Sequence, residues 1–140
     1  MDVILRIRST QRYSGEKAEK TELMSKGTLT QKDDTLYLRY AESALTGLEG
    51  TTTTFAVQPD RITLTREGNF RSEMHFCVGE RHESLYNTGI GVCMVTVLTE
   101  KLQNHLLPNG GSFSVQYAIS VEDAAVGTIT YRIDVTPSEG

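Results

Sequence analysis

The sequence has no tryptophan, two cysteines and three prolines among its 140 residues. Two cysteines cannot build the disulfide framework that staples small secreted domains, so we expect Cys77 and Cys93 to be buried thiols in a reducing cytoplasm. No apolar run approaches the roughly 20 residues of a membrane-spanning helix. The first residues also lack the basic region and apolar core of a signal peptide. These absences favour a cytoplasmic protein.

Positive charge is also scarce. The chain has 14 Lys and Arg against 18 Asp and Glu, which gives a net charge of −4. Binding to nucleic acids or to anionic membranes depends on clustered positive charge, so we expect neither as a partner. A length of 140 residues is typical of one domain, with a core that needs no disulfides. We therefore predict one domain over residues 1–140, as a monomer or a homodimer, without a cofactor.

Apolar and polar residues alternate with a period of two along most of the chain, which is typical of β-strands. The segment 101–107 fits a short helical turn or the end of a strand. Short hairpins between successive strands form a meander, and closing a meander into a barrel removes its exposed edges. The predicted fold is all-β, a single antiparallel meander β-barrel of about eight to ten strands, with a β-sandwich as the alternative. The predicted strands are 3–8, 23–29, 35–42, 51–57, 61–66, 74–78, a segment through 85–86, 92–99, 113–121 and 129–135.

The order of several short motifs resembles one family. These motifs are Tyr-Leu-Arg-Tyr-Ala-Glu at 37–42, Gly50 with the threonines 51–54, Ile-Thr-Leu-Thr-Arg-Glu-Gly at 62–68, Tyr86-Asn87-Thr88 with Gly91 and Thr99, and the strands around Tyr117 and Gly127. Over residues 25–136 the chain resembles the YwiB-like family of uncharacterised bacterial proteins. The resemblance implies a calycin-type, lipocalin-like barrel in the cytoplasm and no established activity. Gly89 and Ile90 replace the proline and aromatic residue of that family.

Strand parity locates polar side chains among the inward-facing ones. Leu36, Leu38, Tyr40 and Glu42 share one face of their strand, and Arg66 shares the face of Ile62 and Leu64. Thr53 has the parity of Phe55, and Tyr117 lies on an apolar face of its strand. We therefore predict a polar cluster inside or at the mouth of the barrel. The candidate ligand-binding residues are Tyr40, Glu42, Arg66, Thr53, Tyr86 and Tyr117.

Three interpretations of this cluster are open. The first is a structural ion pair at a barrel mouth. The second is a site where Arg66 and tyrosine hydroxyls bind a small apolar or anionic ligand. The third is an enzyme that uses Glu42 and Arg66, but no second carboxylate and no nucleophile motif completes such a site. The matching functions are a small-molecule binding protein, an interaction protein with a filled barrel acting through its surface, and an enzyme.

The segment around His75, Cys77 and His82 carries three metal-ligand side chains. A two-residue turn at Gly79-Glu80 would set Cys77 opposite His82, with His75 on the same face. A three-residue turn would send His82 to the other face. The spacing matches no zinc motif, so we predict no metal site. The same register decides whether Tyr86 points into the barrel.

Overall fold

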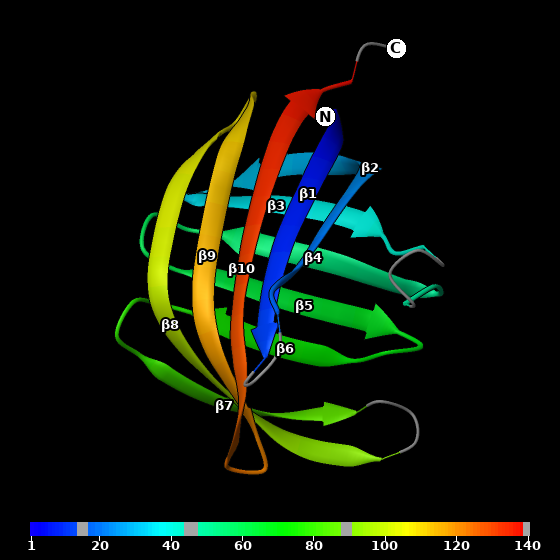
Figure 1. Ribbon diagram of the computed structural model, residues 1–140. Helices are drawn as coiled ribbons and strands as arrows, with labels where there is room; N and C mark the ends of the chain where they lie inside the picture. The colour runs from blue at the N-terminus through cyan, green and yellow to red at the C-terminus, as the bar shows by residue number, and fades with distance from the viewer. Residues whose placement is uncertain (14–16, 44–47, 88–90, 139–140) are drawn as a thin grey trace.

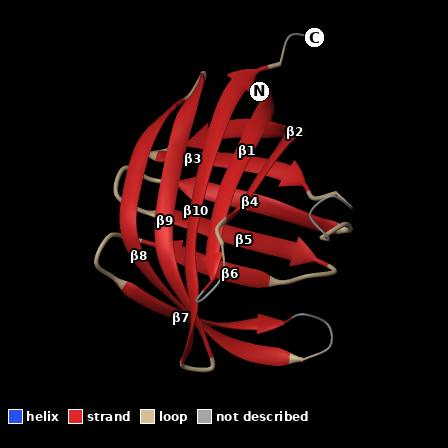
Figure 2. Ribbon diagram, viewed as in Figure 1, coloured by secondary structure: helices blue, strands red, loops and turns tan. Residues whose placement is uncertain are grey.

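A computed structural model describes residues 1–13, 17–43, 48–87 and 91–138, with the backbone alone for Tyr86 and Asn87. The motif positions Thr88, Gly89 and Ile90 therefore lie outside the described residues. Strands and connecting loops make up the described chain (Figure 2). None of its segments forms a helix long and apolar enough to cross a membrane. The strands are β1 (Asp2–Tyr13), β2 (Glu19–Lys32), β3 (Thr35–Ala41), β4 (Thr51–Val57), β5 (Ile62–Gly68), β6 (Ser72–Phe76), β7 (Arg81–Asn87), β8 (Val92–Leu107), β9 (Gly110–Val121) and β10 (Ala124–Pro137).

All ten strands belong to one antiparallel sheet in the order β6-β5-β4-β3-β2-β1-β10-β9-β8-β7. Every neighbour in this order is also a neighbour in sequence, except that β1 pairs with β10. The two ends of the sheet, β6 and β7, contact each other without a hydrogen-bonded ladder among the described residues. The all-β meander barrel is therefore confirmed over the sandwich, and it is nearly closed.

The barrel is flattened into two layers whose strands cross at a steep angle. In Figure 1, β8, β9, β10 and β1 run upright in front, and β3 to β6 run across behind them. A twisted sheet that folds over itself packs its two inner faces together in this way. The layers place residues from β1, β2 and β10 opposite residues from β3, β4 and β5.

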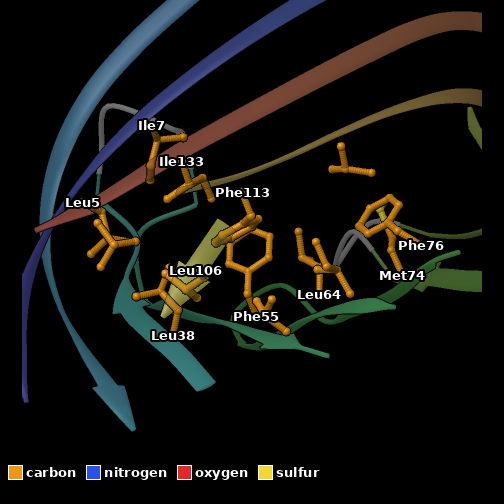
Figure 3. Packing of buried hydrophobic residues seen from close by; sticks show 14 of the residues in the cluster. Leu5, Ile7, Leu38, Phe55, Leu64, Met74, Phe76, Leu106, Phe113 and Ile133 are labelled. Atoms are coloured by element: carbon orange, nitrogen blue, oxygen red, sulfur yellow. The ribbon is translucent and has the colours of Figure 1, made fainter. Parts of the chain in front are cut away.

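The centre of the barrel is filled with apolar side chains. Phe55 and Phe113 meet edge to face, with ring centroids 5.3 Å apart, and Leu5, Leu38 and Ile133 surround them at no exposure (Figure 3). Edge-to-face aromatic pairs add roughly 0.5–1.5 kcal/mol to the free energy gained by burying their area. This packing leaves no room for a ligand at the centre, so a binding site has to lie towards one end.

Of the two alternatives for the segment 101–107, the strand end is confirmed and the helical turn is wrong, because β8 continues to Leu107 after an irregularity between Thr99 and Lys101. The predicted position of one turn was also wrong. The turn after β6 is centred on Val78 and Gly79, not on Gly79 and Glu80: the amide of Glu80 donates to the carbonyl of Cys77 at 2.9 Å. Val78 is 56% exposed, so it does not share the buried face of Met74 and Phe76.

Candidate functional site

A row of directly opposite residues crosses five strands towards one end of the barrel. Gly27 of β2 pairs with Tyr40 of β3, Tyr40 with Thr53 of β4, Thr53 with Arg66 of β5, and Arg66 with Ser72 of β6. Opposite residues in an antiparallel sheet project to the same face. The inward parity of the leucines in β3 and β5 thus brings the phenol, the hydroxyl and the guanidinium to one inner surface.

Glu42, which directly follows the last residue of β3, lies on the same inner surface as this row. Its amide donates to the carbonyl of Thr51 at 2.9 Å, which continues the β3–β4 pairing and keeps its side chain on the face of Tyr40. Glu42 is 9% exposed, and its carboxylate accepts a hydrogen bond from the Thr53 hydroxyl at 2.8 Å. A buried carboxylate needs such partners, because an unsatisfied charge in the interior is strongly destabilising. Glu42 is thereby held in a fixed position.

Tyr40 lies between the two charged groups. Burial raises the pKa of its phenol far above the ordinary value, and the charge of Glu42 and a hydrogen bond to that carboxylate raise it further. The positive charge of Arg66 opposes this effect in part. The phenol therefore stays protonated at every pH that the protein meets, and it acts as a hydrogen-bond donor.

The facing wall comes from the other layer of the barrel. Ser9 of β1 is directly opposite Tyr131 of β10 and Thr21 of β2, and the hydroxyls of Ser9 and Thr21 share a hydrogen bond. Gln11 follows on the same face of β1, and the hydroxyl of Tyr13 donates to its amide oxygen at 2.9 Å. These neutral groups face the charged row across an open space.

That space is a cavity of about 350 Å³. Tyr40, Glu42 and Arg66 line one side of it, and Ser9, Gln11, Thr21 and Tyr131 line the other. Its apolar surfaces belong to Ile7, Leu23, Leu48 and Phe55. Small-molecule sites have this character, with an apolar lining and a few fixed polar groups. We call it the polar cavity.

Tyr117 lies beside the polar cavity rather than in it. It is 2% exposed, and its ring stacks with Tyr131 at 6.4 Å and meets Phe76 at 4.8 Å. It lines a second cavity of about 320 Å³, whose other walls are mostly aliphatic and include Met74 and Cys93. Arg66 and Tyr131 line both cavities. We call the second one the apolar cavity.

The structure brings together four of the six predicted site residues: Tyr40, Glu42, Thr53 and Arg66. Tyr117 reaches the neighbouring cavity, and the side chain of Tyr86 lies outside the described residues. Sequence reasoning missed the facing wall, although one signal could have found it. The parity of Val3, Leu5 and Ile7 continues through Ser9 and Gln11, so the inward face of β1 turns polar at the same end of the barrel.

The histidines of β6 and β7 form a separate pair on the line where these strands meet. The rings of His75 and His82 are 4.2 Å apart, because the turn at Val78–Gly79 sets them opposite each other. The register that would set Cys77 opposite His82, one of the two left open by the sequence, therefore does not occur. Among the described residues, no three His, Cys, Asp or Glu side chains are placed to hold a metal ion.

The sequence from residue 5 to residue 133 matches the family described as Domain of unknown function (DUF1934). The chain belongs to this family. The crystal structure of the YwiB protein from Bacillus subtilis has the same fold, with a TM-score of 0.77 and 18% sequence identity over 97% of this chain and 92% of that chain. The resemblance to the YwiB-like family is thereby confirmed. No curated protein sequence matched the chain. Membership of the DUF1934 family and the barrel fold describe the shape of the protein, but they do not identify a reaction.

Proposed function

We propose that this member of the DUF1934 family is a non-enzymatic binding protein for a small anionic ligand, held in the polar cavity at the end of the barrel. One observation carries the proposal: the Arg66 guanidinium lines a cavity of about 350 Å³ that also has apolar walls. A guanidinium recognises carboxylate and phosphate groups with paired hydrogen bonds. The cavity volume is at the lower end of the range for small-molecule sites.

Glu42 sets a condition on this ligand, because its carboxylate faces the same cavity. It competes with a bound anion for Arg66 and repels it. The hydroxyls of Ser9 and Thr21, the Gln11 amide and the Tyr131 phenol face the charged row and supply further donors. We therefore expect modest affinity, and we expect Glu42 to limit it.

The test uses two variants and two probes, a short monocarboxylate (propionate) and inorganic phosphate, with binding measured by titration calorimetry and thermal shift. Arg66→Met removes the cation, so it should abolish binding of both probes. Its free energy of unfolding should also fall, by about 1–3 kcal/mol, because the loss of the half-buried Arg66 leaves the buried Glu42 carboxylate without this positive charge nearby. Glu42→Gln should tighten binding several-fold, because it removes a nearby negative charge.

Arg39→Met is the matched control, since Arg39 lies next to Tyr40 in β3 with its side chain exposed on the outer face. It should bind both probes as the natural protein does. Equal binding by the natural protein and Arg66→Met would rule out an anion site at Arg66. Weaker binding of the two anions by Glu42→Gln would show that the Glu42 carboxylate supports the anion site, and would overturn the expected competition.

Two other functions have less support. An enzymatic role for Glu42 and Arg66 lacks a second acid or base, because Glu42 is the sole carboxylate among the described residues that line the polar cavity. An interaction function, as a monomer or homodimer, is favoured by the filled centre of the barrel and by exposed Leu85, Leu98 and Val78 around β7. A location in the cytoplasm stays a prediction.

A further inference from the structure

The two ends of the barrel differ in how well their inward side chains are covered. At the end that holds the start of β1 and the end of β10, Val3 and Val135 are buried, at 0% and 2% exposure. At the end with the two cavities, Leu23, Ile119 and Val121 also pack against the core but are only half-buried. Apolar side chains that face inward and still contact solvent gain free energy when an apolar group covers them.

The apolar cavity contains this uncovered surface. Ile119 and Val121 of β9, Ile129 of β10 and Met74 of β6 line it, and Arg66 and Tyr131 separate it from the polar cavity. The guanidinium of Arg66 therefore borders an apolar space on one side and a polar space on the other. A ligand whose charge is held at Arg66 has room for an uncharged part in the apolar cavity.

We propose that the natural ligand is an amphipathic carboxylate, with its anionic group at Arg66 and an apolar tail in the apolar cavity. This inference rests on the proposed anion site and adds the chemical class of the ligand. Two aromatic side chains support it: Tyr131 lines both cavities, and its ring is stacked with that of Tyr117, which lines the apolar cavity. Each methylene of the tail that leaves water should raise the affinity about fourfold.

Cys93 provides a direct probe of the apolar cavity, because this half-buried side chain lines that cavity and is absent from the lining of the polar one. The second cysteine, Cys77, lies in the turn after β6 and is replaced by serine for the experiment. In the Cys77→Ser protein, the rate of Cys93 labelling by a small maleimide is measured against straight-chain monocarboxylates of about three to about ten carbons. Primary alcohols of the same lengths serve as uncharged controls.

Carboxylates should protect Cys93 from labelling, with an affinity that rises about fourfold per methylene until the cavity is full. Alcohols of equal length should protect it more weakly. Arg66→Met should remove the preference for carboxylates and retain the dependence on length. Ile119→Asn, which changes only the apolar cavity, should retain binding of propionate and lose the gain with length.

The outcomes separate this inference from the proposed function. Affinity that does not change with chain length, together with unprotected Cys93, would overturn the amphipathic ligand and leave the anion site standing. Protection that grows with length equally for acids and alcohols would overturn the role of Arg66 in both. The comparison of chain lengths in the Cys77→Ser protein needs no further variant. It therefore tests whether the apolar cavity binds the tail even if Ile119→Asn does not fold.

Discussion

His82 shows how position alone changes the chemistry of a side chain. Its ring lies 4.2 Å from that of His75, and its Nδ1 atom is buried without a hydrogen bond among the described residues. Burial lowers the pKa of His82, the neighbouring charge of His75 lowers it further, and Glu73 opposes this in part. Thr63 contacts His75 Nδ1 at 3.4 Å, and Glu73 lies 3.6 Å from its Nε2. His82 is thus neutral in the folded protein at a pH where the unfolded chain carries its charge.

This difference predicts a loss of stability on acidification. Since the folded pKa of His82 lies below its unfolded value near 6.5, its contribution is complete above about pH 6.5 and is lost as the pH falls below that value. Urea unfolding at about pH 8 and about pH 5.5 measures the effect. We expect the midpoint of His82→Gln to change less between the two pH values than that of the natural protein. Equal changes in both proteins would show that folding does not lower the pKa of His82.

The parity of residues along the strands was enough to predict part of the site. The residue types in the turn after β6 were not enough to predict where that turn is centred. Tyr40 and Arg66 share the parity of buried leucines, so their inward direction follows from the sequence. The partner of His82 depends on one turn: Gly79 adopts a φ of +81°, which suits the second central position of a type II turn and places the turn at Val78–Gly79. A sequence with Val-Gly-Glu in succession does not distinguish this turn from one centred a residue later.

At the scale of strands, one glycine holds the polar row in place. A Cβ atom on Gly27 would lie 2.5 Å from the carbonyl oxygen of Arg39, 2.8 Å from Cδ1 of Leu5 and 3.2 Å from Cβ of Tyr40. Strands β2 and β3 can therefore approach each other beside Tyr40 because residue 27 has no side chain. This contact depends on the pairing of Gly27 with Tyr40, which sequence periodicity does not reveal.

Gly27→Ala should therefore act on both stability and binding. The added methyl group has to displace the backbone at Arg39, so we expect the free energy of unfolding to fall by about 1–3 kcal/mol. The shift should also move Tyr40 and weaken propionate binding. Gly91→Ala is the matched control, since a Cβ atom there meets no other atom within 4 Å. If the two variants are equally stable in urea, the close approach at Gly27 does not constrain the strands.

At the scale of the whole molecule, the strands that carry the chain termini, β1 and β10, lie in the middle of the strand order. The incomplete closure lies between its two ends, β6 and β7. The first and last strands pair along their length, with Val3 opposite Pro137, and the amide of Ser138 donates to the carbonyl of Asp2 at 2.9 Å. Among the described residues, no ladder joins β6 and β7, which are consecutive in sequence. Of the ladders that these residues form, the one between β1 and β10 joins the strands most distant in sequence, so its loop-closure entropy is the largest.

A circular permutant tests whether this pairing limits folding. Joining the termini through a short glycine linker and opening the chain between Val78 and Gly79 puts the strands in the order β7-β8-β9-β10-β1 to β6, so every ladder joins strands adjacent in sequence. We expect refolding about tenfold faster than in the natural protein, measured by stopped flow after dilution from urea.

Opening between Pro108 and Asn109 is the control, because it makes the long β8–β9 ladder distant in sequence. That control should refold no faster than the natural protein. Equal rates for the first permutant and the natural protein would show that β1 and β10 pair after the rate-limiting step.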